Sequence, residues 1–162
     1  MELAQKEVGQ GTGWSDTIIL ENAGFKVVQA PLLENLFGMI QFKRFDCFPL
    51  GANEAHALLE RYRQDCPDVI IEPRLLIRYP FGRLFFVNKN DGELHDMVKT
   101  GLITAFNNGS FWKLFRSHGS NAGLFTRANI KDRVQIEISN TNLTEEFKTI
   151  PDKYFFSLDM LD

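Results

Sequence analysis

Hydrophobic residues recur along this chain in two patterns, as short runs and as longer segments with a spacing of three to four. Short runs rich in β-branched and aromatic residues predict strands, whereas the longer spacing predicts amphipathic helices. In the first half the two patterns alternate. The expected strands are 6–10, 25–30, 45–48, 69–71, 75–79 and 84–87, and the expected helices are 14–22, 32–43 and 53–64, the last capped by Asn53.

This alternation predicts an α/β fold with a mainly parallel central sheet and helices on both of its faces. Ligands of such sheets bind beyond the carboxyl ends of the strands. We therefore expect segments 11–15, 49–54 and 80–82, which follow strands, to lie near one edge of the sheet.

The second half changes character after the break at Asn90-Asp91-Gly92. A helix over 93–106 is expected to carry a wide apolar stripe, followed by a short helix at 110–116, a strand at 134–138 and a polar tail. Leaving such a stripe in water forgoes about 1.5–3 kcal/mol for each large side chain. We therefore expect helix 93–106 to pack on the first half in a rearranged form or on a second copy, with homodimerisation or segment exchange as the favoured outcome.

Composition and charge restrict the class of protein. The 162 residues are 44% hydrophobic and 24% charged, as in a globular chain, and no apolar run of about 18 residues predicts a membrane span. The N-terminus has no apolar core of the signal-peptide kind. Residues 74–133 carry ten basic and four acidic side chains, but Arg74, Arg78 and Arg83 are spread among apolar strand residues. We therefore expect no nucleic-acid partner.

The residue types that usually carry chemistry are scattered. Cys47 and Cys66 have no metal-ligand spacing, and a disulfide between them stays open. The histidines are isolated from one another, and no serine lies in a nucleophile motif. We therefore expect no metal, no cofactor and no enzymatic activity.

Residues 7–16 stand out because they predict a strand that runs through a glycine loop into a helix. Such a helix start has unpaired backbone N–H groups and the positive end of the helix dipole, which suit a carboxylate or phosphate. A dinucleotide or P-loop motif is disfavoured, because no lysine follows and the third glycine, Gly13, comes too early.

Three segments resemble the type 2 periplasmic substrate-binding proteins, especially the amino-acid-binding branch of ABC import systems. Segment 8–16 resembles the strand, loop and helix that open the second lobe of that family. Segment 43–55 resembles its Gly-Arg-x-Asp-Ala strand and the helix after it. Segments 84–89 and 93–116 resemble the strand that ends the second lobe and the helix with an Asp-Gly-Ser/Thr-Phe element, here Asn108-Gly109-Ser110-Phe111.

The resemblance implies a fold and a location. Residues 6–89 would form an intact α/β lobe, equivalent to lobe two, and residues 90–162 the returning C-terminal segment of lobe one, whose N-terminal part is missing. The expected fold is thus a single lobe with a mainly parallel sheet, followed by C-terminal helices and an extended tail. The resemblance also implies hinge closure on a ligand, a periplasmic location and ABC transporter membrane subunits as partners.

The resemblance also implies a set of ligand-binding residues. Thr12, Gly13 and Trp14 would bind a carboxylate through backbone N–H groups and a hydroxyl, unless Thr12 or Ser15 merely caps the helix. The family often places an acidic residue for the ligand's ammonium group where Leu50-Gly51 stands here. Glu54 either replaces that residue or is a solvated surface side chain. The candidate ligand-binding residues are Thr12, Gly13, Trp14, Ser15, Gly51 and Glu54.

The expected function is that of a truncated solute-binding domain, which binds a small polar or carboxylate solute without catalysis. The alternative is a self-associating structural or interaction module that has lost ligand binding.

Overall fold

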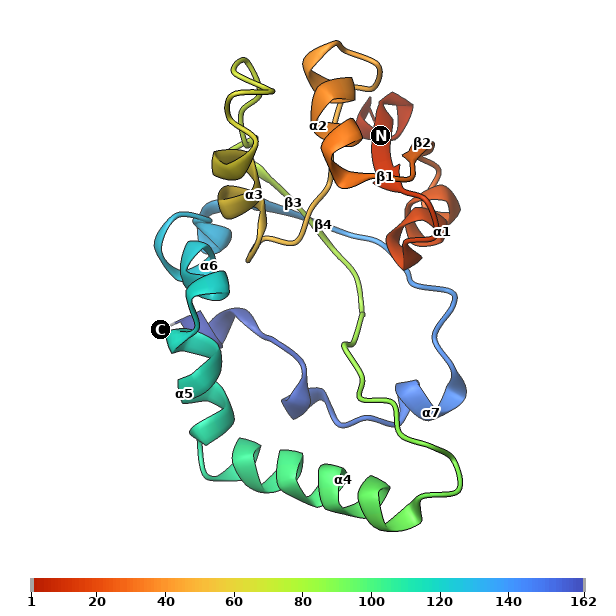
Figure 1. The fold of residues 1–162 in the computed structure, drawn as a ribbon, viewed down its shortest axis with the longest axis vertical. Coiled ribbons are helices and arrows are strands. Elements are labelled where there is room, and N and C mark those ends of the chain that lie inside the picture. The colour runs from red at the N-terminus through yellow and green to blue at the C-terminus, as the bar shows by residue number, and fades with distance from the viewer. Residues whose placement is uncertain (1, 162) are drawn as a thin grey trace.

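The computed structural model describes residues 2–161 and shows a mixed α/β fold with short parallel strands in two small sheets (Figure 1). In the first sheet β1 (Glu7–Gly11) pairs with β2 (Lys26–Ala30), and in the second β3 (Leu75–Arg78) pairs with β4 (Val134–Glu137). The α/β character and parallel pairing are thus confirmed. The strands form two pairs instead of the expected central sheet.

The five expected helices form close to where the apolar spacing predicts them, whereas the short helices at Ala122–Thr126 and Glu145–Lys148 were not predicted. Helix 53–64 is the exception, because only its central residues are helical. The helices are α1 (Ser15–Asn22), α2 (Leu33–Gln41), α3 (Ala55–Arg61), α4 (Gly92–Asn107), α5 (Ser110–Ser117), α6 (Ala122–Thr126) and α7 (Glu145–Lys148). Short 3₁₀ turns cover Glu2–Gln5, Gly119–Asn121, Ile130–Asp132, Asp152–Tyr154 and Leu158–Leu161. None of the helices in this described range is long and apolar enough to cross a membrane.

A shared apolar cluster joins the two sheets. Val8 of β1 packs with Leu20 of α1 and with Phe25, and all three are buried. Ile77 of β3 and Ile138, just after β4, pack against this cluster. The second sheet is therefore fixed to the first by burial of its apolar face.

Three of the expected strands are wrong, because the backbone of each is bonded in another way or lacks a partner. Segment 45–48 forms a single bridge, between Val8 and Cys47, before Pro49 ends it. At 69–71 the Arg63 side chain donates to the Val69 carbonyl at 2.8 Å. Segment 84–87 is extended without any strand beside it among residues 2–161, so its β-forming residues have nothing to pair with.

The expected cap of helix 53–64 is also wrong. The residue that precedes α3 is Glu54, and its side chain makes no capping bond. The Asn53 amide instead donates to the Asn121 side-chain oxygen at 3.4 Å, toward the second half of the chain. The Asn53 side chain thus takes part in a tertiary contact, and its oxygen does not cap α3.

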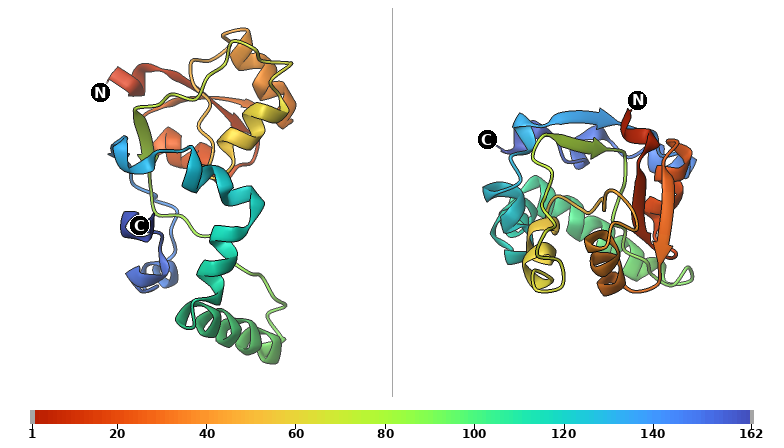
Figure 2. Two further views of the ribbon diagram at one scale, coloured as in Figure 1. Left: turned by 90° about the vertical axis from the view of Figure 1, so that its left-hand side faces the viewer. Right: turned by 90° about the horizontal axis from the view of Figure 1, so that it is seen from above.

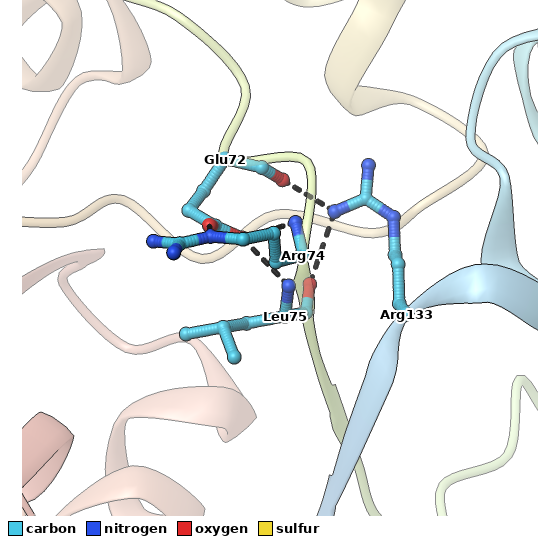
Figure 3. A network of polar contacts seen from close by, with 4 residues as sticks. All are labelled: Glu72, Arg74, Leu75 and Arg133. Atoms are coloured by element: carbon cyan, nitrogen blue, oxygen red, sulfur yellow. Dashed lines mark hydrogen bonds and ion pairs between the residues drawn. The ribbon is translucent and has the colours of Figure 1, made fainter.

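Arg133 holds the start of β3 against β4 (Figure 3). Its Nη1 donates to the Glu72 carbonyl and, at 3.0 Å, to the Leu75 carbonyl, while its Nε donates to the Ala128 carbonyl at 2.6 Å. The Glu72 carboxylate accepts from the backbone N–H of Leu75 at 2.6 Å and of Arg74 at 2.7 Å. One guanidinium therefore satisfies three carbonyls at the β3–β4 junction.

The β3–β4 pair joins the two segments that the resemblance separates at residue 89/90. β3 lies in the first segment and β4 in the second, and they pair from Leu75–Val134 to Arg78–Glu137. The division into 6–89 and 90–162 stays a prediction, and in this structure the two segments share a sheet.

Helix α4 lies apart from both sheets, at the bottom of Figure 1, and is linked to the remainder through α5. Asp91 caps it by accepting from the Leu94 N–H at 2.9 Å. Within the described chain no side chain of α4 is buried, and Met97 is 64% exposed. Near its end Phe106 contacts Tyr154, with ring centroids 4.8 Å apart. Packing of the stripe on the first half is therefore not observed, and packing on a second copy stays a prediction.

Replacing Arg133 by Lys tests the junction between β3 and β4. Lysine keeps the charge but loses the planar fork, so at least one of the three carbonyls loses its partner. We expect the free energy of unfolding, measured with urea, to fall by about 1–3 kcal/mol. Arg83→Lys, at an exposed position, is the matched control and should change it by less than about 0.5 kcal/mol. Equal stability of both variants would show that the fork is dispensable.

Candidate functional site

The loop between β1 and α1 is a tight, hydrogen-bonded turn. The Trp14 N–H donates to the Gly11 carbonyl at 3.0 Å, and Gly13 between them has a positive φ of 79°. A turn that closes in this way with positive φ at its third residue is of type II and favours glycine there. The Thr12 N–H donates to the Ala30 carbonyl at 2.9 Å, which continues the β1–β2 ladder. The glycine pattern is thus explained first by backbone geometry.

Trp14 folds its indole ring back over Gly11. A Cβ at Gly11 would lie 2.1 Å from the indole ring, so a side chain there is excluded while Trp14 keeps this position. The Trp14 ring is also stacked on the Phe48 ring, with ring centroids 6.4 Å apart. Trp14 therefore works as part of the packing between the turn and the segment after residue 45.

Helix α1 begins without a side-chain cap. Trp14 is the N-cap residue, so the alternatives in which Thr12 or Ser15 caps the helix are wrong. The Thr17 N–H donates to the Trp14 carbonyl at 3.2 Å, and the Thr17 hydroxyl donates to the Gly11 carbonyl at 3.4 Å. Within residues 2–161 the backbone N–H groups of Ser15 and Asp16 have no acceptor. These two donors, with the exposed Thr12 side chain, are the polar groups that the turn offers.

Asp16 changes the charge of this helix start. Its carboxylate accepts a hydrogen bond from the Tyr79 hydroxyl, and Tyr79 directly follows β3. Burial, then the bond to Asp16 and its charge, raise the pKa of Tyr79, so the phenol keeps its proton and donates. The carboxylate also supplies the negative charge that the helix dipole favours. The acidic residue at the start of α1 can be read from the sequence. Its hydrogen bond to Tyr79 could not be predicted, because it depends on the position of β3.

The end of segment 45–48 lies beside the same turn. The Gln10 side-chain amide donates to the Pro49 carbonyl at 2.9 Å, and Gly9 donates to the Cys47 carbonyl at 2.8 Å. The side-chain oxygen of Gln10 is buried and has no partner among the described residues. The start of segment 49–54 therefore lies beside the end of β1, whereas the meeting of segments 11–15 and 49–54 at one sheet edge stays a prediction. The segment after β3 reaches this edge through Tyr79, while Gly82 lies against the Phe147 ring.

Gly51 and Glu54 form a local turn. The Glu54 carboxylate accepts from the Gly51 N–H at 3.3 Å, and the Glu54 N–H donates to the Gly51 carbonyl at 2.9 Å. A Cβ at Gly51 would lie 2.8 Å from the Asn53 amide oxygen, which favours glycine at this position. The Glu54 carboxylate is thus turned onto its own backbone.

The other reactive side chains do not gather near the turn. Cys47 and Cys66 are free thiols, and burial raises the pKa of each. His56 lies against Gly123 of α6, and burial lowers its pKa. No group of three or more His, Cys, Asp or Glu that could hold a metal ion is found in the part of the chain that the structure describes. An open hollow of about 500 Å³ lies beside α2 and is lined by residues that include Glu34, Phe42 and Arg44.

Comparison of the chain with protein-family models, curated proteins and solved structures gave no match.

Substituting the two loop glycines tests the turn. Gly11→Ala should displace the indole ring, and Gly13→Ala should strain a left-handed backbone, each lowering the free energy of unfolding by about 1 kcal/mol or more. Gly11→Ala should also shift tryptophan fluorescence emission, because Trp14 loses its stack on Phe48. Urea unfolding and emission spectra measure these two effects.

Gly38→Ala is the matched control, because it lies within α2 and a Cβ there meets nothing within 4 Å. It should stabilise the chain by about 0.5–1 kcal/mol through helix propensity. An unchanged emission spectrum in Gly11→Ala would contradict the position of the indole.

Proposed function

We propose that this chain is a solute-binding domain that holds a small polar or carboxylate-bearing solute at the turn between β1 and α1, without catalysis. The observation that carries the proposal is the pair of unpaired N–H groups of Ser15 and Asp16 at the start of α1. They lie close in sequence to the exposed Thr12 side chain and follow β1, whose Gln10 side chain contacts Pro49. A helix start with free donors is suited to the carboxylate of a solute.

The charge of Asp16 favours a zwitterion over a simple anion. A purely anionic solute at this helix start would face the Asp16 carboxylate at close range, which opposes binding. An amino acid can place its carboxylate at the N–H groups and its ammonium group toward Asp16. Asp16 would then supply the acidic group that a glycine at position 51 cannot supply. Glu54 does not supply it, because its carboxylate is bonded to the Gly51 N–H.

The wider assignment is proposed on the residues that carry the resemblance. The domain would correspond to one lobe of a type 2 periplasmic substrate-binding protein of the amino-acid branch, and would act with ABC transporter membrane subunits in the periplasm. Parallel pairing of β1 with β2, and the connection from β1 through a glycine turn into α1, support this assignment.

A thermal-shift screen tests the binding proposal. Neutral amino acids and small dicarboxylates at the same concentration form the panel, and we expect an amino acid to raise Tm by several degrees more than a dicarboxylate does. A ligand at about 100 times its Kd adds about 2.7 kcal/mol of stability, which for a chain of this size is several degrees. An unchanged Tm with every ligand of the panel would contradict the proposal.

Asp16→Asn distinguishes the zwitterion preference from non-specific stabilisation. Loss of the carboxylate should weaken amino-acid binding about tenfold or more, and dicarboxylates should then no longer bind more weakly than amino acids. Asp65→Asn changes an exposed aspartate in a turn and should leave both series unaltered. Isothermal titration of each variant with the best amino acid measures the Kd directly. An unchanged Kd in Asp16→Asn would contradict the role of Asp16.

A further inference from the structure

We infer that α4 and α5 form an interface for a second copy of this chain, in which the two copies pack these helices antiparallel about a twofold axis. We call residues 91–118 the arm. The arm extends below both sheets in Figure 2, left, and its two helices meet at Gly109, which has a positive φ of 78°. Helix α4 projects from the remainder of the chain, whereas one side of α5 packs on α6 through Trp112 and Phe115, which contact Phe125.

The arm presents apolar side chains that the described chain leaves uncovered. Met97 is 64% exposed and Leu114 is 63% exposed. The further exposed apolar side chains of the arm are Leu94, Leu102, Ile103 and Phe111. Leu94, Met97 and Leu102 lie along one side of α4, whereas Ile103 lies on the opposite side. Exposed apolar side chains that gather on one side of a helix are typical of a protein–protein interface.

The charges of the arm select a second copy in an antiparallel arrangement. Residues 91–98 carry Asp91, Glu93 and Asp96 and no Lys or Arg, whereas residues 107–118 carry Lys113 and Arg116 and no Asp or Glu. Antiparallel pairing places the acidic start of one arm against the basic end of the other, twice in each dimer. Parallel pairing would place like charges together. The arm is therefore complementary to itself, as a twofold interface requires.

Gly101 allows close approach near the middle of α4. A Cβ built at Gly101 meets nothing within 4 Å in the described structure, so no group of the same chain occupies this position. In an antiparallel dimer the centre of α4 lies near the twofold axis, where the two backbones come closest. The distance between packed helices depends on the side chains at that point, and a glycine shortens it.

The size of the arm fits a small interface between two copies. The 16 residues of α4 and the 8 residues of α5 make roughly 36 Å of helix at 1.5 Å per residue. A helical surface of that length and about 10 Å in width carries several hundred Å² of accessible area. A standard interface buries about 800 Å² on each partner, so the arm alone would form an interface at the small end of the range.

Light scattering on the full chain tests the inference. The wild type at tens of micromolar should have twice the mass of one chain. Glu93→Lys and Lys113→Glu should each weaken the dimer at least tenfold, because each places like charges at both ends of the interface. An equimolar mixture of the two variants should recover dimers, since positions 93 and 113 then face each other with opposite charges at both ends of the mixed pair.

Two controls on the opposite part of the chain keep this test specific. Glu21→Lys and Lys26→Glu are the same charge changes at exposed positions of α1 and β2, and both should remain dimeric. A monomeric wild type, or a mixture of the arm variants that stays monomeric, would overturn the inference. Dimers that persist in both single variants would overturn it as well.

The inference is independent of solute binding. The arm shares no residue with the turn at 11–16, so Glu93→Lys should keep the thermal shift that the wild type shows with an amino acid. A flat thermal shift together with a charge-sensitive dimer would reject the solute-binding proposal alone. A thermal shift without dimers would reject the interface alone.

Discussion

The parallel pairing of β3 with β4 is the constraint on which the arrangement of this chain depends. It brings residues 75–78 beside residues 134–137 and so closes a long loop that contains the arm. Loop-closure entropy rises only slowly with length, so a long excursion is tolerated if its ends are held firmly. Arg133 does this through the carbonyls of Glu72 and Leu75, and Ile77 and Ile138 fix the pair to the core. The position of Tyr79 follows from this pairing.

What could be predicted from the sequence was local. Helices α1 to α5 follow from the spacing of apolar residues, whereas the short α6 and α7 were not predicted. The turn before α1 follows from Gly13, whose positive φ only glycine adopts readily. Segment 84–87 has the composition of a strand but no partner in the described range, and β propensity largely expresses packing against neighbours. The partner of β3, far along the chain, leaves no signal in the apolar pattern of residues 75–78.

The candidate site shows the same division. The free N–H groups at the start of α1 follow from the strand, turn and helix, which are continuous in sequence. The acidic character of the site depends on Asp16, and the orientation of that carboxylate depends on the Tyr79 hydroxyl. A buried phenol with a raised pKa keeps its proton, so it fixes Asp16 by donation without neutralising its charge. The start of α1 therefore combines free N–H donors with a carboxylate acceptor, and only the donors could be predicted from the local sequence.

Helix α4 shows why exposure and secondary structure must be considered together. A helix of this length is marginal in water on propensity alone, and most helical stability in proteins comes from burying an apolar face. Within the described chain the support for α4 is the Asp91 cap at its start and the aromatic contacts of Phe106 at its end. Its central residues, around Met97 and Gly101, have no such support. The apolar stripe that makes α4 predictable as a helix is thus also the part that most requires a covering surface, and the charge polarity of the arm is the reason that we propose another arm as that surface.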